Sequence, residues 1–204
     1  MAPRKQKRRG KKGVRQQLPV ILICCQGTVT EVEYFSNYKQ SLRAPHITIE
    51  SRALDPIKLA KHALTLAKRG SYDEVYIVVD VDDSTSQEFD QAIAFCRKNT
   101  TKKHEIHMVI SNPCFDLWLY LHKKPLPQQE TDRKVLSCFL EQQEFLYGKP
   151  PKHVSSAFDC SDPSGALREA SKQPLDLDEL GPNPSTSVPH LVLRIKSTAQ
   201  QRRK

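Results

Sequence analysis

Two aspartates at the end of an apolar run are the side chains best placed to do chemistry. Residues 75–79 are almost wholly apolar, and Asp80-Val81-Asp82-Asp83 follows directly. In an extended backbone, residues two apart point to the same side, so Asp80 and Asp82 share a face. Their carboxylates repel each other unless a cation lies between them, and Mg²⁺ prefers oxygen ligands of this kind. The doublet therefore predicts a divalent-metal site, and the alternative is that the two aspartates cap the next helix or begin a turn.

Two further segments place polar residues just beyond apolar runs. The first is Cys25-Gln26-Gly27-Thr28-Val29-Thr30-Glu31, and the second is Ser111-Asn112-Pro113-Cys114-Phe115-Asp116. We expect Thr30 to cap a helix and Glu31 to lie in its first turn, where a carboxylate favours the helix dipole. Asp116 lies between apolar neighbours and needs a partner, which leaves a site role, a buried salt bridge or a cap open.

The elements that must position these residues alternate in type along the first 124 residues. Strands are predicted over 20–24, 47–49, 75–79 and 104–110, and helices over 31–41, 57–68, 86–99 and 114–121. The second helix has a clear start, because Asp55 can cap it and Pro56 suits its first turn. This order predicts an α/β fold with a mostly parallel four-stranded sheet flanked by helices. Right-handed crossovers then bring the strand ends to one edge.

The pattern changes after Lys123. We expect a helix over 133–146, a proline-rich stretch, a short helix over 163–172 and a final helix over 185–195, with Ser185 or Thr186 as its cap. The predicted organisation is a disordered basic arm (1–17), an α/β core (18–124), a helical, proline-rich C-terminal extension packing on the core (125–195) and a basic tail (196–204).

The net charge of +9 is concentrated at the two ends. Residues 1–15 hold eight Lys or Arg and 196–204 hold four, with no acid in either segment, so residues 16–195 carry a formal charge of −3. A basic arm poor in apolar residues is expected to be disordered when free. It could contact a phosphate backbone, with an affinity that falls as salt rises, or act as a solubilising tail.

Several classes of protein are disfavoured by what the sequence lacks. The six cysteines form no Cys-x-x-Cys pair, which argues against structural zinc, and Cys24 and Cys25 are expected to pack inside a strand. No signal peptide and no membrane-length apolar run is found, so we expect a soluble, cytoplasmic protein without membrane contact. No Walker-type phosphate loop is present, and ATP hydrolysis would have to come from a partner.

Four ordered motifs within about residues 18–195 resemble the RloB family. They are Cys25-Gln26-Gly27-x-x-Thr30-Glu31-x-x-Tyr34-Phe35, Asp80-x-Asp82, Ser111-Asn112-Pro113-Cys114-Phe115-Asp116-Leu117-Trp118-Leu119 and Asn183-Pro184-Ser185-Thr186. The resemblance implies a Toprim-like core, linkage to restriction–modification and abortive-infection loci, and an ATPase partner of AAA or ABC type. It also implies a centre binding Mg²⁺ or Mn²⁺, built from a glutamate after the first strand and the Asp-x-Asp pair.

The sequence departs from the family pattern at two of these positions. Gln26 stands where the family typically has glutamate, and Asp116 where glutamate is common. Glutamine is neutral and cannot act as a general base, although its carbonyl oxygen can still bind a metal weakly. The resemblance makes Gln26, Glu31, Asp80, Asp82 and Asp116 the candidate catalytic set.

Two functions follow, together with a weaker third. The first is a Toprim-like nuclease that hydrolyses phosphodiesters of DNA or of RNA such as tRNA in anti-phage defence, with Asp80, Asp82 and Glu31 holding Mg²⁺ or Mn²⁺. The second is a catalytically degenerate subunit that binds nucleic acid or an ATPase partner, with Gln26 as the inactivating change. The third is a small nucleotide-processing enzyme.

Overall fold

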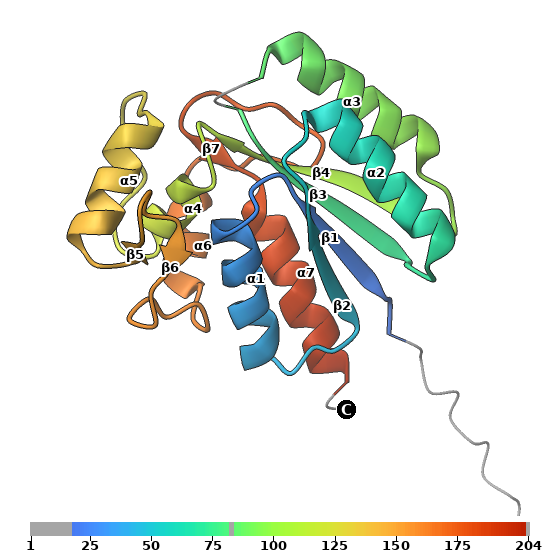
Figure 1. The fold of residues 1–204 in the computed structure, drawn as a ribbon, viewed down its shortest axis with the longest axis horizontal. Coiled ribbons are helices and arrows are strands. Elements are labelled where there is room, and N and C mark those ends of the chain that lie inside the picture. Colours follow the sequence, from blue (N-terminus) through green and yellow to red (C-terminus); the bar gives the residue numbers. More distant parts are fainter. Residues whose placement is uncertain (1–17, 82–83, 203–204) are drawn as a thin grey trace, which may run out of the picture.

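One mixed sheet with a layer of helices on each face organises the protein (Figure 1). A computed structural model describes residues 18–81 and 84–202. The strands are β1 (Ile21–Cys25), β2 (Ile47–Ser51), β3 (Glu74–Asp80), β4 (Glu105–Asn112), β5 (Leu146–Tyr147), β6 (His153–Val154) and β7 (Ser185–Thr186). The helices are α1 (Thr30–Ser41), α2 (Pro56–Arg69), α3 (Ser86–Asn99), α4 (Asp116–Leu121), α5 (Arg133–Gln142), α6 (Ser164–Ala170) and α7 (Val188–Gln201).

The main sheet has the strand order β2-β1-β3-β4-β7, and its first four strands are parallel. The register places Cys25 opposite Val78 and Asp80 opposite Ser111, so β1, β3 and β4 end at one edge. The predicted α/β class, with a mostly parallel sheet flanked by helices, is confirmed. The predicted number of strands is wrong, because the antiparallel strand β7 adds a fifth.

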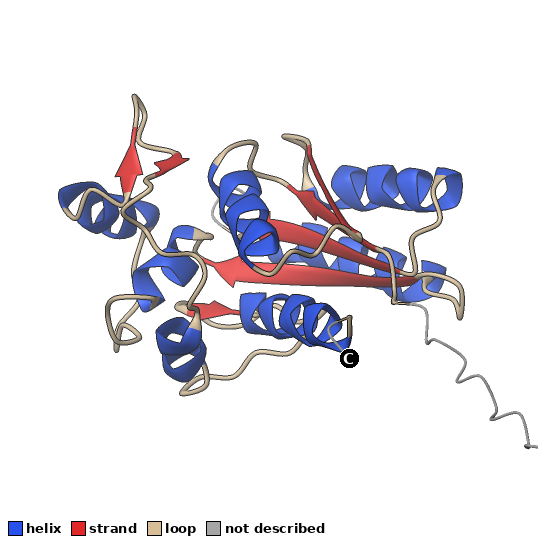
Figure 2. Cartoon of the chain, turned by 90° about the horizontal axis from the view of Figure 1, so that it is seen from below, coloured by secondary structure: helices blue, strands red, loops and turns tan. Residues whose placement is uncertain are grey.

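Side chains alternate along each strand and so divide the core between the two faces of the sheet, which the helices cover (Figures 1 and 2). Val75, Ile77 and Val79 pack with α2 and α3, whereas Tyr76 and Val78 pack with α1 and α7. Each fully buried side chain of this size contributes roughly 1.5–3 kcal/mol. The same alternation directs Asp80, two residues after Val78, to the α1 side of the sheet.

The helix starts confirm one predicted cap and overturn another. Asp55 accepts a hydrogen bond from the Lys58 N–H at 2.8 Å, with Pro56 in the first turn, as predicted. Thr30 does not cap α1, because it is already the first residue of that helix. Its hydroxyl instead donates to the Lys152 carbonyl at 2.8 Å and so joins the core to the C-terminal part of the chain.

The C-terminal part contains short strands where helices were predicted. Helix α5 ends at Gln142, and Leu146 belongs to a small antiparallel hairpin formed by β5 and β6. Ser185 and Thr186 form β7 rather than the start of the last helix, which begins at Val188 and continues to Gln201. Thr186 still accepts a hydrogen bond from the Val188 N–H, at 3.3 Å.

The remaining predictions concern the two cysteines of β1 and the basic segments at the two ends of the chain. Cys24 and Cys25 are buried and carry free thiols, which confirms their packing role. The basic arm predicted over 1–17 lies outside the described residues, as do residues 203–204 of the basic tail. None of the helices within 18–81 and 84–202 combines the length and apolar composition needed to cross a bilayer.

Candidate active site

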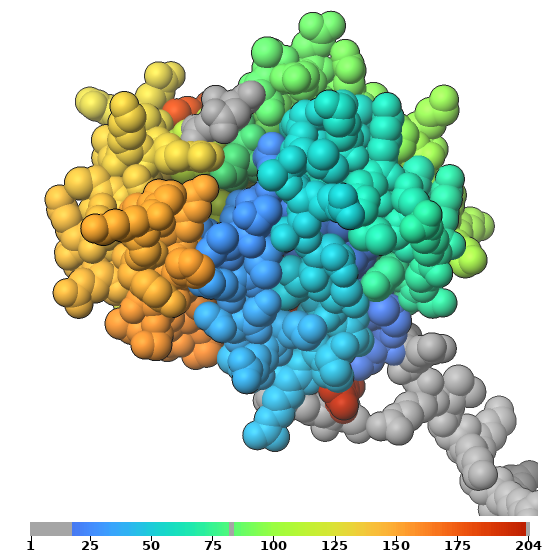
Figure 3. Space-filling view, viewed as in Figure 1, coloured from blue at the N-terminus to red at the C-terminus, as the bar shows by residue number. Residues whose placement is uncertain are grey.

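A pocket of about 470 Å³ lies at the edge of the sheet where β1, β3 and β4 end. The core contributes Asp80 and the segments 26–31, 53–54 and 114–116 to its wall. The C-terminal part contributes Arg133 and Ser137 of α5 and the segment 150–152 of the β5–β6 hairpin. Figure 3 shows the yellow and orange surface of this C-terminal part lying against the blue surface of α1. The pocket therefore lies between two parts of the chain that are distant in sequence.

Asp80 is the last residue of β3, and both of its carboxylate oxygens have partners. Oδ1 accepts a hydrogen bond from the Phe115 N–H at 2.9 Å, and Oδ2 pairs with the Arg133 guanidinium at 3.1 Å. Burial raises the pKa of Asp80 well above its usual value, and the negative charges of Glu31 and Asp116 raise it further. Arg133 and the Phe115 N–H oppose this rise. Asp80 thus lies in a concentration of negative charge that one arginine balances in part.

Glu31 lies in the first turn of α1 and is only 6% exposed. Burial raises its pKa, while hydrogen bonds from its own N–H and that of Gly27, and the nearby charge of Arg133, act to lower it. A Cβ on residue 27 would collide with the Glu31 carboxylate, so only glycine allows the carboxylate to lie there. The absence of a side chain at Gly27 therefore leaves the space that the Glu31 carboxylate occupies.

Asp116 is the first residue of α4 and forms part of the pocket wall. Its charge contributes to the raised pKa of Asp80, which places the two carboxylates within electrostatic reach of each other. Its neighbours Phe115 and Trp118 are buried in the core, as predicted, rather than exposed as stacking surfaces. The structure therefore brings Asp116 to the same edge as Asp80 and Glu31.

Gln26 joins two strand ends through its side-chain amide. Its carbonyl oxygen accepts from the Asp80 N–H at 3.1 Å, and its amide group donates to the Leu54 carbonyl at 3.1 Å. A glutamate could accept the first hydrogen bond but could not donate the second. Gln26 consequently has a structural role at the pocket that a carboxylate would fulfil only in part.

The pocket gathers four of the five candidate catalytic residues: Gln26, Glu31, Asp80 and Asp116. Asp82, the fifth, lies outside the described residues. Among residues 18–81 and 84–202, no group of three or more His, Cys, Asp or Glu side chains is arranged to hold a metal ion. The metal-binding role of Asp80, Asp82 and Glu31 stays a prediction.

The chemistry of the pocket fits a hard divalent cation. Its acidic side chains offer only oxygen ligands, the type that Mg²⁺ and Mn²⁺ favour. Because repulsion from Glu31 and Asp116 raises the pKa of Asp80, a cation bound between these groups would relieve an unfavourable interaction. The donor types and the local excess of negative charge are therefore those that such an ion requires.

Two basic residues of the pocket were not predicted from the sequence. Arg133 begins α5 and Lys152 precedes β6, both in the C-terminal part of the chain. Neither residue lies in a motif with fixed spacing from Asp80. Only the docking of the C-terminal part onto the core brings them to the strand ends.

The fold and the pocket define a Rossmann-like α/β protein with an acidic pocket at the carboxyl edge of a parallel sheet. The family model for the RloB-like protein matches residues 21–195. The chain therefore belongs to the RloB-like protein family, which confirms the resemblance of its motifs. Comparisons with curated proteins and with solved structures gave no match.

Proposed function

We propose that this protein is a Toprim-like nuclease that hydrolyses phosphodiester bonds with the help of Mg²⁺ or Mn²⁺. The observation that carries this proposal is the grouping of Glu31, Asp80 and Asp116 around one pocket at the carboxyl edge of the sheet. Ligand sites of open α/β sheets lie at this edge. Family membership supports the proposal, because three of the four motifs of the resemblance supply most of the core side of the pocket wall.

In this proposal Asp80, Asp82 and Glu31 hold the metal ion. When bound, Mg²⁺ would stabilise negative charge on the phosphate and favour attack by water. The Phe115 N–H orients Oδ1 of Asp80, and the backbone N–H groups of Gly27 and Glu31 orient the Glu31 carboxylate.

The proposed substrate is DNA or an RNA such as tRNA. The basic segments at the two ends of the chain would contribute contacts with the phosphate backbone that weaken as salt is raised. We place the activity in bacterial anti-phage defence linked to restriction–modification or abortive infection. An ATPase partner of AAA or ABC type would supply the nucleotide hydrolysis for which the chain has no phosphate loop.

Metal titration combined with a cleavage assay tests the proposal. We expect calorimetry to detect Mg²⁺ and Mn²⁺ binding to the wild-type protein, and a mixed pool of DNA and tRNA to be cleaved in the same buffer. Excess EDTA should abolish the cleavage. A protein that binds neither ion at millimolar concentration would contradict the proposal.

A catalytically degenerate subunit is the second candidate, and Gln26 is the observation that favours it. Both polar atoms of the Gln26 amide are used in backbone hydrogen bonds, so this side chain acts as a structural bridge and not as a base. Such a subunit would bind nucleic acid or an ATPase partner without cleaving phosphodiesters. Metal binding without cleavage in the experiment above would support this alternative.

Gln26→Glu is expected to destabilise the metal-free protein and to increase the stabilisation that the protein gains from Mn²⁺. The variant loses the hydrogen bond to Leu54 and gains a charge beside Asp80, at a cost of about 1–3 kcal/mol in the free energy of unfolding. Saturating Mn²⁺ should offset this loss, and metal-dependent cleavage should rise. Thermal unfolding in EDTA and in Mn²⁺ measures the first effect.

Gln26→Ala provides the control, because it removes both hydrogen bonds without adding a charge. It should be destabilised in EDTA to a similar degree, yet gain no more from Mn²⁺ than the wild type does. If Mn²⁺ raised the thermal midpoint of both variants equally, a charge at position 26 would not act on a metal site.

A further inference from the structure

Arg133 brings a positive charge to the acidic pocket from outside the core. It is the first residue of α5 and lies 53 positions after Asp80, to whose Oδ2 it donates a hydrogen bond at 3.1 Å. Its side chain is 46% exposed, whereas that of Asp80 is 18% exposed. The guanidinium is therefore the more exposed partner of a partly buried carboxylate.

The C-terminal part is fastened to the core by contacts other than this ion pair. Thr30 donates to the Lys152 carbonyl, and Glu33 accepts hydrogen bonds from the Val154 N–H and from His153, both at 2.7 Å. Helix α5 also packs on α4 through the buried side chains of Leu136 and Leu140. Moving the Arg133 side chain away from Asp80 would leave these contacts in place.

Asp80 already has a cationic partner at one of its two carboxylate oxygens. Oδ1 accepts from the Phe115 N–H and keeps a second lone pair, whereas Oδ2 is the oxygen that carries the positively charged partner. Arg133 already lies at Oδ2. A divalent ion and a guanidinium on the same oxygen would repel each other at short range, in surroundings that screen charge less than water does.

We propose that Arg133 is the internal counter-cation of the pocket, and that Arg133 and the divalent metal ion compete for Oδ2 of Asp80. This inference rests on the proposed metal-dependent function. In the metal-free protein the arginine balances part of the charge of Glu31 and Asp80, an effect seen in its lowering of both pKa values. Metal binding then requires the guanidinium to leave Oδ2, while the C-terminal part stays docked.

The test compares Mn²⁺ affinity in Arg133→Gln with that in Lys134→Gln. Lys134 is the next residue of α5, is exposed and is not part of the pocket wall, so its variant removes the same charge without touching Asp80. We expect calorimetry to give roughly tenfold tighter Mn²⁺ binding for Arg133→Gln. Lys134→Gln should bind as the wild type does. Arg133→Lys keeps the charge, so its Mn²⁺ affinity should be closer to that of the wild type than to that of Arg133→Gln.

The thermal midpoint in EDTA provides a second measurement that does not depend on activity. Arg133→Gln should be less stable than Lys134→Gln without metal, and the difference should shrink in saturating Mn²⁺. Equal or weaker Mn²⁺ binding by Arg133→Gln would overturn the inference and leave the proposed nuclease intact. Absence of Mn²⁺ binding in all four proteins would overturn both.

Discussion

Asp80→Asn is expected to reduce metal-dependent cleavage at least ~10³-fold without lowering stability. The variant keeps an oxygen that can accept from the Phe115 N–H but loses the charge that would hold the metal ion. A loss of this size corresponds to about 4 kcal/mol of transition-state stabilisation, within the range that a metal ion supplies. Steady-state cleavage of the DNA and tRNA pool measures it.

The stability of this variant distinguishes a functional residue from a structural one. Asp80→Asn loses its ion pair with Arg133 but also the repulsion from Glu31 and Asp116, so the thermal midpoint should not fall. Asp90→Asn is the matched control, because Asp90 is exposed on α3 and is not part of the pocket wall. If Asp80→Asn still cleaved the pool, the cleavage reaction would not take place at this pocket. Asp82→Asn extends the test to the second half of the doublet.

The sheet and the strand-end positions of the pocket could be predicted because each depends on local pattern. Strand β3 is a continuous apolar run that a buried parallel strand requires, and its length fixes where Asp80 emerges. The parallel register then brings Gln26 and Asp116 to the same edge as Asp80. The meeting of Gln26, Glu31, Asp80 and Asp116 at one edge of the sheet could therefore be predicted from the sequence.

The remainder of the pocket depends on tertiary contacts that leave no periodic signal. Strands β5, β6 and β7 each contain two residues, which are too few to show an alternation of apolar and polar side chains. The role of Thr30 was predicted incorrectly because a hydroxyl at a helix start is typical of a cap, whereas here Lys152 competes for it. The place of Arg133 in the pocket could not be predicted either, because Arg133 meets Asp80 only when the C-terminal part docks on the core.

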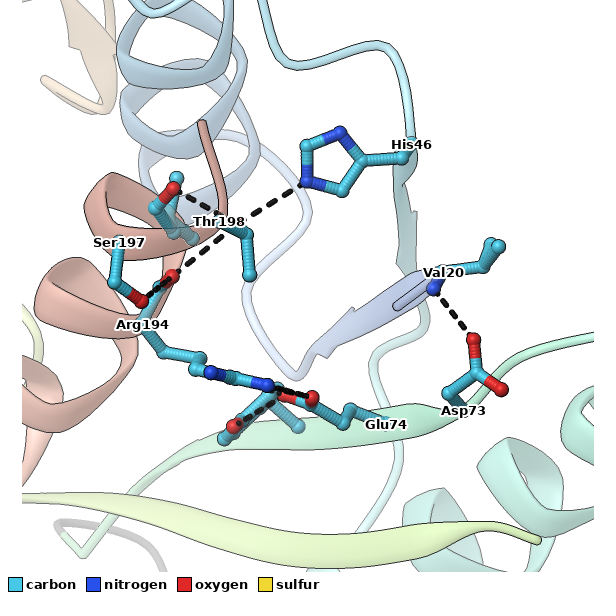
Figure 4. A network of polar contacts seen from close by, with 9 residues as sticks. Val20, His46, Asp73, Glu74, Arg194, Ser197 and Thr198 are labelled. Atoms are coloured by element: carbon cyan, nitrogen blue, oxygen red, sulfur yellow. Dashed lines mark hydrogen bonds and ion pairs between the residues drawn. The ribbon is translucent and has the colours of Figure 1, made fainter. Parts of the chain in front are cut away.

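Arg194→Ala is expected to lower the free energy of unfolding by about 3 kcal/mol. Arg194 of α7 donates to both oxygens of Glu74 at the start of β3, at the opposite end of the strand from Asp80 (Figure 4). Glu74 is 5% exposed and also accepts from the Tyr76 hydroxyl at 2.9 Å. Removing one partner of a buried pair costs about 3–5 kcal/mol, and we expect the lower end because the Arg194 side chain is 38% exposed.

The pH dependence of this variant follows from the carboxylate that it leaves unpaired. Burial acts to raise the pKa of Glu74, but the hydrogen bonds from Arg194 and Tyr76 hold it below its usual value of 4.5. The pair therefore stabilises the fold above about pH 4.5, and this contribution is lost as the pH falls through the lowered pKa. The difference in the free energy of unfolding between the wild type and Arg194→Ala should therefore become smaller in acid.

Urea unfolding at pH 7 and pH 4 measures both effects, with Lys196→Ala as the control. Lys196 is exposed on α7 two residues further on, so its variant removes a like charge from the same helix without touching Glu74. Mn²⁺ affinity should be the same in Arg194→Ala as in the wild type, because the pocket lies at the other edge of the sheet. A loss of stability no larger than that of Lys196→Ala would show that the pair does not fasten α7 to the sheet.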